Sequence, residues 1–315
     1  MSSSFIENLF ILGLAFIIDF LFGEPPVLVH PTVWMGRIIS FLKLKFKSLN
    51  SRKEKINGIL IWLLCFLIFI PSICIILIIV KKVNYMLYIF VVALLLKPAF
   101  AVKSWSFHIN PLIKALKEEN IIEARKLVGK IVGRNTKELS KEQVTSAAIE
   151  TIAEGIVDGV ASPIFYFAIF GLPGAWAFRL ANTFDSMIGY RNSEHINIGW
   201  FSAKIDTLLN FLPARLSAIT MLLACLILKR DWKFANRILI RDKNLSLSVN
   251  SGWPMAAMAG ILKVRLEKPK FYILGKELRP PTIEDIFLAL KVMHLTIFLF
   301  ILIFVVPITF LLSII

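Results

Sequence analysis

Long apolar segments are the feature that most restricts how this chain can fold. Residues 58–80 contain no charged side chain, and residues 286–315 carry only Lys291 and His294 near their start. A helix of ~20 apolar residues can cross ~30 Å of hydrocarbon, so both segments are long enough to span a membrane. Other apolar segments lie at residues 5–22, 85–102, 160–178 and 211–228.

The composition agrees with a membrane protein. Hydrophobic residues make up 57% of the 315 residues, and the mean hydropathy is +0.75, which is too apolar for a soluble domain. No internal repeat or low-complexity segment divides the chain. The sequence therefore predicts an all-α fold, a polytopic helical bundle that forms a single integral membrane domain over residues 1–315. We expect a multi-pass protein of the cell membrane, with the lipid bilayer as its partner.

The chain is strongly basic, and its charge is unevenly distributed. The formal net charge is +15; residues 37–55 hold seven basic residues against one acid, and residues 229–279 hold twelve against four. The positive-inside rule places such segments in the cytoplasm, where they also face anionic lipid head groups. No base-stacking aromatic platform accompanies them, so nucleic-acid binding is not expected. The three cysteines lie in apolar segments without ligand spacing, which argues against a disulfide or zinc site.

Three acids occupy an otherwise uncharged stretch. Within residues 144–178 the only charged side chains are Glu150, Glu154 and Asp158, each four residues from the next. Four-residue spacing places side chains on one face of a helix. Because unpaired buried charges are costly, we expect a cation against this column: a metal ion, an Arg or a bound substrate.

Local signals predict where the helices around this column begin and break. Ser140 and Gln143 match a capping box, which would start a helix that runs into the acids, and residues 121–131 form an amphipathic stretch. The helix either stops near Gly159 or continues to Ser162 and Pro163. Two glycines and a proline in residues 171–174 predict a re-entrant hairpin or a broken helix. Irregular backbone at membrane depth must line an enclosed cavity, so we expect a pocket beside the acids.

A second polar stretch follows at residues 179–192. It gathers guanidiniums, amides, hydroxyls, a phenol and a carboxylate between apolar segments, and Asn182, Asp185 and Ser186 would share a helix face. Oxygen ligands suit Mg²⁺, and planar guanidiniums suit phosphate. Alternatively, these groups pair with one another inside a helix bundle. The same residue types recur one segment later as Asp206, Asn210 and Arg215.

The polar motifs follow one another in a distinctive order. They are Asp19-x3-Gly23-Glu24-Pro25-Pro26, His30-Pro31, Met35-Gly36-Arg37, Val132-Gly133-Arg134, Glu150-x3-Glu154-x2-Val157-Asp158-Gly159-x3-Pro163, Asn182-Thr183-x-Asp185-Ser186-Met187-x-Gly189-Tyr190-Arg191-Asn192, Pro213-Ala214-Arg215 and Asn250-Ser251-Gly252-Trp253-Pro254-Met255-Ala256-Ala257. In this order the chain resembles the CobD/CbiB family of membrane proteins of cobalamin biosynthesis over nearly its whole length. Two departures are Gly155, where the resemblance leads us to expect Asn, and residues 241–249, which lack a His.

The resemblance implies an acid–amine ligase, an adenosylcobinamide-phosphate synthase. Such an enzyme uses ATP to join adenosylcobyric acid to 1-amino-2-propanol phosphate or a related amino alcohol. A carboxylate reacts with an amine only after its oxygen becomes a leaving group, and phosphorylation by ATP supplies one. Mg²⁺ would bridge the polyphosphate. No Walker A sequence occurs, so ATP binding requires another architecture.

Roles for individual residues follow from this chemistry. We expect Glu154, Asp158 and Asp185 to bind the metal directly or through water, and Glu150 to be a further ligand or the base that keeps the amine neutral. The candidates for binding phosphate or other substrate groups are Arg134, Arg179, Asn182, Ser186, Tyr190, Arg191, Asp206, Asn210, Arg215, His30 and Trp253. His30 precedes Pro31 at a helix entry, so a structural role is the alternative for it. Trp253 is either an apolar wall for the corrinoid ring or an interface anchor.

Two other functions and the topology stay open at this stage. A transporter could use the carboxylates to relay protons or bind a cation, and a CDP-alcohol phosphotransferase also uses acids on membrane helices. The latter requires Arg at the position of Ser162. We expect residues 160–178 and 211–228 to dip into the bilayer around a cytoplasm-facing cavity, and a homo-oligomer is compatible with the sequence.

Overall fold

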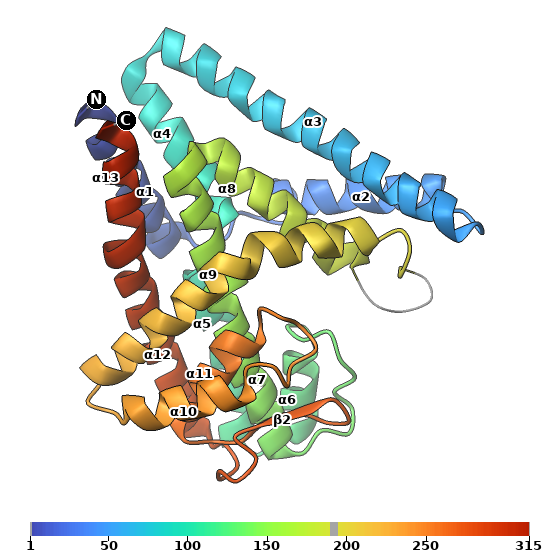
Figure 1. Ribbon diagram of the computed structural model, residues 1–315, viewed down its shortest axis with the longest axis vertical. Helices are drawn as coiled ribbons and strands as arrows, with labels where there is room; N and C mark the ends of the chain where they lie inside the picture. The colour runs from blue at the N-terminus through green and yellow to red at the C-terminus, as the bar shows by residue number, and fades with distance from the viewer. Residues whose placement is uncertain (1, 190–194, 315) are drawn as a thin grey trace. The chain divides into compact units, whose positions relative to one another are not determined.

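The chain folds into two compact units built almost entirely of helices. The computed structural model describes residues 2–189 and 195–314 (Figure 1). Unit 1 comprises Met1–Ala101, Ser162–Leu209 and Phe304–Ile315, and unit 2 comprises Val102–Ala161 and Asn210–Ile303. Within the described residues, the named β-strands are two short ones that form a single sheet. The predicted all-α class is therefore confirmed.

In the part of the chain that the structure describes, six helical stretches are long and apolar enough to cross a membrane. They are Phe5–Phe22, Ser51–Val83, Tyr85–Lys117, Lys141–Ile188, Trp200–Ile227 and Ile283–Ile314. Each contains all or most of one of the apolar segments that the sequence predicts. By length and composition, the chain is a multi-pass membrane protein.

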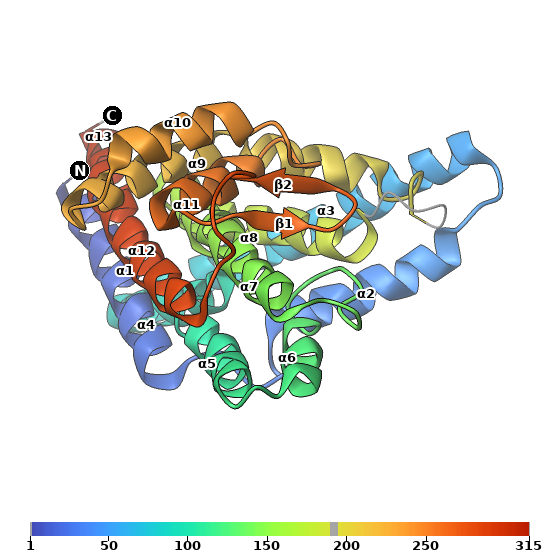
Figure 2. The ribbon, with the colours of Figure 1, turned by 90° about the horizontal axis from the view of Figure 1, so that it is seen from below.

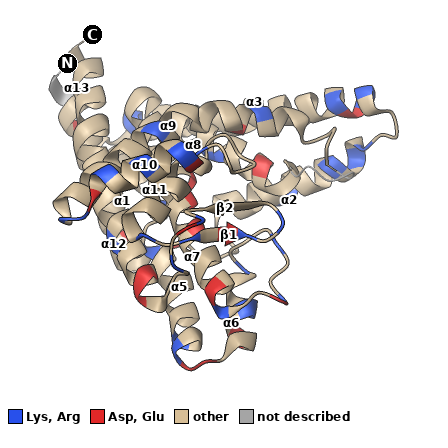
Figure 3. Cartoon of the chain, turned by 60° about the horizontal axis from the view of Figure 1, so that its bottom comes forward, with Lys and Arg blue, Asp and Glu red and all other residues tan. Residues whose placement is uncertain are grey.

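Unit 1 is organised around one long helix, α8. Its elements are α1 (Ser2–Phe22), α2 (Pro31–Phe46), α3 (Ser51–Val83), α4 (Tyr85–Leu96), the 3-10 turn η1 (Lys97–Ala99), α8 (Ser162–Ile188), the first part of α9 (Trp200–Ile227) and α13 (Val306–Ile314). Helices α2, α3, α4 and α13 all pack against α8, while α1 packs against α4 and α13. The end of α2 and the start of α3 carry a cluster of Lys and Arg, whereas the rest of α3 is almost free of charge (Figure 3). These basic residues belong to the first predicted cytoplasmic segment.

Helix α8 is broken where the sequence predicts it. Gly171 has φ +66° and ψ −157°, a conformation that only glycine adopts readily, so two helices meet there at an angle. The rings of Tyr166 and Phe178, twelve residues apart in sequence, stack with their centroids 5.8 Å apart, so the chain turns back on itself at this break. The predicted interruption is therefore confirmed, and its two halves form a hairpin.

Unit 2 surrounds the helix that carries the acids. Its elements are α5 (Lys103–Lys117), α6 (Ile121–Val128), α7 (Lys141–Gly155), the π-helical η2 (Ile156–Ala161), the rest of α9, α10 (Trp232–Asp242), α11 (Gly252–Leu262), β1 (Leu266–Lys268), β2 (Tyr272–Leu274), α12 (Ile283–Phe300) and the first part of the π-helical η3 (Ile301–Val305). Strands β1 and β2 form an antiparallel hairpin, with Lys268 opposite Tyr272. Strand β1 lies on α7, and β2 lies beside α11 (Figure 2). The hairpin therefore brings side chains distant in sequence to the acid-bearing helix.

Helix α7 begins at the predicted capping box. The Ser140 hydroxyl accepts from the Gln143 backbone N–H at 3.2 Å, and the Gln143 side chain accepts from the Ser140 N–H at 3.0 Å. The helical backbone then passes through Glu150 and Glu154, widens into η2 around Asp158 and continues into α8. Of the two predicted ends, the helix therefore continues to Ser162. A π-helical turn inside an α-helix is frequent at functional sites.

Gly155 is required by the packing of α7 against α5. A Cβ atom at this position would lie 1.9 Å from Cζ2 of Trp105. The indole therefore fills the space that a side chain at position 155 would need. This contact explains why Gly stands where the family resemblance leads us to expect Asn.

A buried ion-pair cluster joins the end of α1 to η1 in unit 1. The Lys97 side chain is only 2% exposed, and its Nζ lies 3.2 Å from Asp19 Oδ1 and 2.9 Å from Glu24 Oε1. Burying an ammonium group is costly unless anionic groups surround it. Lys97 is thus tied to both acids of the Asp19-to-Pro26 motif.

The Trp105 contact predicts the effect of enlarging Gly155. Gly155→Ala should lower the free energy of unfolding by about 1–3 kcal/mol through overpacking, although alanine favours helix by ~1 kcal/mol. Denaturant titration of the purified protein in detergent measures this change. Gly13→Ala is the matched control, because nothing lies within 4 Å of a Cβ at that helical position. Equal stability of the two variants would contradict the packing argument.

Removing the buried ammonium tests the ion-pair cluster. Lys97→Met should lower the free energy of unfolding by about 3–5 kcal/mol, because it leaves two carboxylates without their buried cation. Lys114→Met, which removes an ammonium with a side chain 77% exposed and 3.9 Å from Glu118, should change stability by less than ~1 kcal/mol. A Lys97 variant as stable as the Lys114 variant would show that the buried pairs contribute nothing.

Candidate functional site

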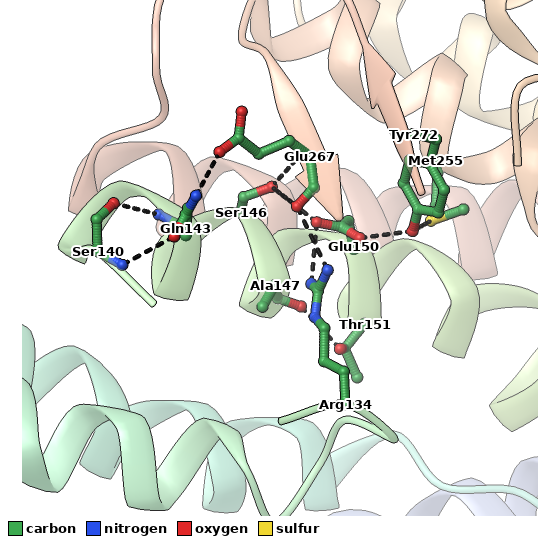
Figure 4. Close-up of polar contacts among 10 residues, drawn as sticks. All are labelled: Arg134, Ser140, Gln143, Ser146, Ala147, Glu150, Thr151, Met255, Glu267 and Tyr272. Atoms are coloured by element: carbon green, nitrogen blue, oxygen red, sulfur yellow. Dashed lines mark hydrogen bonds and ion pairs between the residues drawn. The ribbon is translucent and has the colours of Figure 1, made fainter. Parts of the chain in front are cut away.

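The most deeply buried acid of the column, Glu150, is held by three donors in unit 2. Its side chain accepts from Arg134 Nη2 at 3.1 Å, from Ser146 Oγ at 2.7 Å and from the Tyr272 hydroxyl at 2.6 Å (Figure 4). Burial and the neighbouring Glu150 carboxylate raise the pKa of Tyr272, so its phenol stays protonated and remains a donor. The residue is 3% exposed, and these bonds offset the cost of burying its charge.

The hairpin backbone completes this cluster. Arg134 Nη1 donates to the Glu267 carbonyl at 3.3 Å, and the Glu267 N–H donates to Ser146 Oγ at 2.7 Å. The Gln143 amide donates to Glu267 Oε1 at 2.9 Å, which links the capping box to β1. Arg134, a predicted phosphate ligand, is therefore the cationic partner of the acid column. The sequence reasoning missed Ser146, Glu267 and Tyr272, since no local motif marks them.

Glu154 and Asp158 follow Glu150 along the same helical stretch and are half-buried. The charged and polar neighbours of Glu154 are Glu150, Lys268, Arg134 and Ser251. Two basic side chains of the protein, Arg134 and Lys268, thus lie near the column. Ser251 is the N-cap residue of α11 and belongs to the motif that begins at Asn250.

The predicted residues in the middle of α9 contribute to a second group in unit 2. The Arg215 guanidinium carbon lies 3.4 Å from the ring centroid of Phe211 and 4.9 Å from that of Trp253. Its Nη1 donates to Asn250 Oδ1 at 3.1 Å. Lys243 Nζ lies 4.3 Å from the Trp253 ring centroid. Trp253 therefore lies in basic surroundings, with cations against its ring. Asn210, also predicted, is buried.

A pocket of about 670 Å³ lies between α2 and α8 in unit 1, a size that suits a small-molecule ligand. Its lining combines apolar surface with several polar side chains and consists of Thr32, Val33, Gly36, Arg37, Ser40, Arg179, Asn182, Thr183, Ser186 and Met187. The structure thus brings the predicted Arg179, Asn182 and Ser186 together. Thr32 and Arg37 were not among the predicted site residues, although Arg37 belongs to the Met35-Gly36-Arg37 motif.

Close helix packing and fixed hydrogen bonds shape this pocket. A Cβ at Gly36 would lie 2.8 Å from Sδ of Met187, so glycine lets α2 approach α8. Arg179 Nε donates to the Ala99 carbonyl at 2.8 Å, and its Nη1 donates to Asn182 Oδ1 at 2.9 Å. The guanidinium is therefore oriented before any ligand arrives.

Two carboxylates lie close together beside the polar residues of α8. Asp206 is the charged neighbour of Asp185, and Asn182 Nδ2 donates to Asp206 Oδ1 at 3.4 Å. Within residues 2–189 and 195–314, no group of three His, Cys, Asp or Glu side chains is arranged to hold a metal ion. Mg²⁺, however, is often held by one or two carboxylates together with water and substrate phosphates. The Asp185 and Asp206 pair fits that mode of binding.

The remaining predicted residues are His30, Tyr190 and Arg191. His30 caps α2: its Nδ1 accepts from the Thr32 N–H at 3.3 Å and lies 2.7 Å from Thr32 Oγ1. Its Nε2 lies 3.0 Å from Glu24 Oε2. Tyr190 and Arg191 fall outside the residues that the structure describes.

Comparison with known proteins agrees with the motif order. Residues 12–299 match the family described as CobD/Cbib protein. A probable cobalamin biosynthesis protein CobD from Methanothermobacter thermautotrophicus is 40% identical over 92% of this chain and 94% of its own length. The cobalamin biosynthesis protein CobD from Dehalococcoides mccartyi is 38% identical over 87% of this chain and 89% of its own. No solved structure matches the chain. Because both the family and these relatives are matched over most of its length, the chain belongs to the CobD/Cbib protein family.

Proposed function

We propose that this protein is an adenosylcobinamide-phosphate synthase. In this reaction ATP activates a carboxylate of adenosylcobyric acid, and the amine of 1-amino-2-propanol phosphate, or of a related amino alcohol, forms the amide. Membership of a family whose relatives are named for cobalamin biosynthesis supports the pathway. The observation that carries the proposal for this chain is the pocket of unit 1, which combines two guanidiniums with hydroxyl and amide groups.

In this proposal, Arg37 and Arg179 bind phosphate oxygens in the pocket. Planar guanidiniums pair well with phosphate, and the Ala99 carbonyl already orients Arg179. Asn182 and Ser186 supply further hydrogen bonds to the same ligand. ATP and the amino-alcohol phosphate both offer the phosphate that this arrangement would recognise.

The acids divide into two roles. Asp185 with Asp206 in unit 1, and Glu154 with Asp158 in unit 2, are separate candidates to hold Mg²⁺, which when bound would neutralise charge on the polyphosphate during transfer. Glu150 instead acts as a positioning residue, because its three donors fix Arg134 and the hairpin around α7. The basic α2–α3 segment supports an active site that faces the cytoplasm, where ATP is available.

Neutralising the acids tests their role. Glu154→Gln and Asp158→Asn should each reduce cobinamide-phosphate formation at least about a hundredfold, because each removes charge that stabilises the transferring phosphate. Product formation per mole of membrane-inserted protein is the measurement. Glu119→Gln, at a position whose side chain is 84% exposed, is the control and should behave as wild type. Reduced insertion with normal activity of the inserted protein would instead assign the acids a structural role.

The metal requirement separates the synthase from a proton-relay transporter. Activity should disappear in EDTA and return with Mg²⁺ or Mn²⁺, but not with Ca²⁺, whose longer and looser coordination misplaces the phosphoryl group. Amide product is measured with both substrates and ATP present. Activity that is indifferent to divalent ions, together with gradient-driven corrinoid uptake into proteoliposomes, would overturn the proposed function.

A further inference from the structure

A continuous line of polar side chains leads from the buried ion-pair cluster to the wall of the unit 1 pocket. Lys97 contacts Glu24 at 2.9 Å, Glu24 contacts His30 at 3.0 Å, and His30 Nδ1 lies 2.7 Å from Thr32 Oγ1. Thr32 lines the pocket. A hydroxyl, an imidazole and a carboxylate are thus connected in sequence, with the hydroxyl at the ligand-accessible end.

The hydrogen bonds determine where the protons lie. The Thr32 backbone N–H can only donate, so His30 Nδ1 must carry the lone pair that accepts it. The ring proton is therefore on Nε2 and is donated to Glu24 Oε2. It follows that the Thr32 hydroxyl donates its own proton to Nδ1. The lone pairs of Thr32 Oγ1 then remain to accept a proton from a group in the pocket.

Glu24 is suited to support a positive charge on His30. Burial acts to raise the pKa of Glu24, but its hydrogen bond to His30 and its pairing with Lys97 outweigh this effect and lower the pKa. The carboxylate is therefore ionised at neutral pH, and it contacts the imidazole directly. The other charged groups near the line are Asp19 beside Lys97, and Arg37 and Arg179 in the pocket lining.

We propose that Thr32, His30 and Glu24 form a proton relay that deprotonates the amine substrate in this pocket, an inference that rests on the proposed amide-forming function. The substrate ammonium gives one N–H proton to Thr32 Oγ1, and the original hydroxyl proton moves to His30 Nδ1. The substrate is left as a neutral amine with a lone pair, and His30 becomes an imidazolium facing Glu24. Thr32 is the catalytic residue, while His30, Glu24 and Lys97 act through it.

The proposed reaction requires such a relay. An alkyl ammonium group has a pKa of about 10, so at pH 7 only about one amine in a thousand is neutral and able to attack a carbonyl carbon. A positioned general base typically accelerates such a step by about 10²–10⁴. Glu150, the base that the sequence suggested as an alternative to a metal ligand, already accepts from three donors.

The competing explanation is that His30 only caps α2, and the choice of variant separates the two. Asparagine is among the best N-cap residues, so His30→Asn keeps an acceptor for the Thr32 N–H but removes the imidazole. Thr32→Val removes the hydroxyl at nearly constant shape, whereas Thr32→Ser keeps it. A structural role predicts normal turnover for His30→Asn, and the relay predicts a loss.

The experiment measures kcat and KM of the full-length protein in detergent between about pH 6.5 and pH 9.5, with ATP, Mg²⁺, adenosylcobyric acid and 1-amino-2-propanol phosphate. At pH 7, His30→Asn and Thr32→Val should each lower kcat about a hundredfold with little change in KM. Thr32→Ser, which keeps the hydroxyl, should have a clearly higher kcat than Thr32→Val. The deficit should shrink about tenfold for each pH unit, because the neutral fraction of the amine rises by that factor. Thermal unfolding of each variant verifies that the fold is retained.

The outcomes distinguish failure of the relay from failure of the proposed function. A wild-type protein that forms no amide overturns the proposed function and the relay with it. An active wild type with normal turnover in His30→Asn or Thr32→Val overturns the relay alone. A loss of kcat that is independent of pH also overturns the relay, because it indicates a distorted pocket. Raising the neutral fraction of the amine would not restore turnover in such a pocket. If His30→Asn does not fold, the comparison of Thr32→Val with Thr32→Ser tests the relay, with the same expected loss of kcat and the same dependence on pH.

Discussion

The cost of burying charge in an apolar protein is the constraint on which the rest of this structure depends. A chain with so few polar residues in its helices cannot leave an interior carboxylate or ammonium unpaired. Glu150 meets this requirement with three donors, and Lys97 meets it with two carboxylates. Each cluster joins elements that are far apart in sequence, so satisfying the charge also specifies the tertiary structure of its unit.

The contacts that stabilise the two buried clusters also position the functional side chains near them. In unit 2, the partners of Glu150 bring Arg134 and the β-hairpin against α7, and Lys268 of the hairpin becomes a neighbour of Glu154. In unit 1, Lys97 holds Glu24, which contacts His30 at the start of α2. The lining of the pocket between α2 and α8 begins two residues beyond that histidine, at Thr32. The same hydrogen bonds and ion pairs therefore stabilise each unit and position its functional side chains.

Glycines allow the close approaches that these clusters need. Gly36 lets α2 approach Met187 of α8, and Gly155 admits the Trp105 indole beside the acid-bearing helix. Gly171 supplies a backbone conformation that breaks α8. A side chain at position 155 would overlap the Trp105 indole, one at position 36 would require Met187 to move, and one at position 171 would strain the backbone. The family resemblance pointed to Asn at position 155, and only the neighbouring helix shows why Gly stands there.

The sequence by itself determined the features that depend on near neighbours along the chain. Apolar segments of sufficient length predicted the membrane helices, Ser140 and Gln143 predicted the start of α7, and the glycines around Pro173 predicted the break in α8. Each of these signals arises from hydrogen bonds or steric limits within a few residues, or from the length of an apolar run. The spacing of the acids likewise showed that they need a cation, but not which one.

Only the tertiary structure decided the partners. Tyr272 is 122 residues from Glu150, and the Lys97 ammonium meets acids that lie before the start of α2, so no local periodicity connects them. Thr32 and Arg37 become pocket residues because α2 packs against α8. Arg134, a predicted phosphate ligand, is likewise found paired with the buried Glu150, a contact that no local pattern indicates. The physical reason is that the role of a polar side chain depends on the groups that surround it after folding, and those groups come from distant parts of the chain.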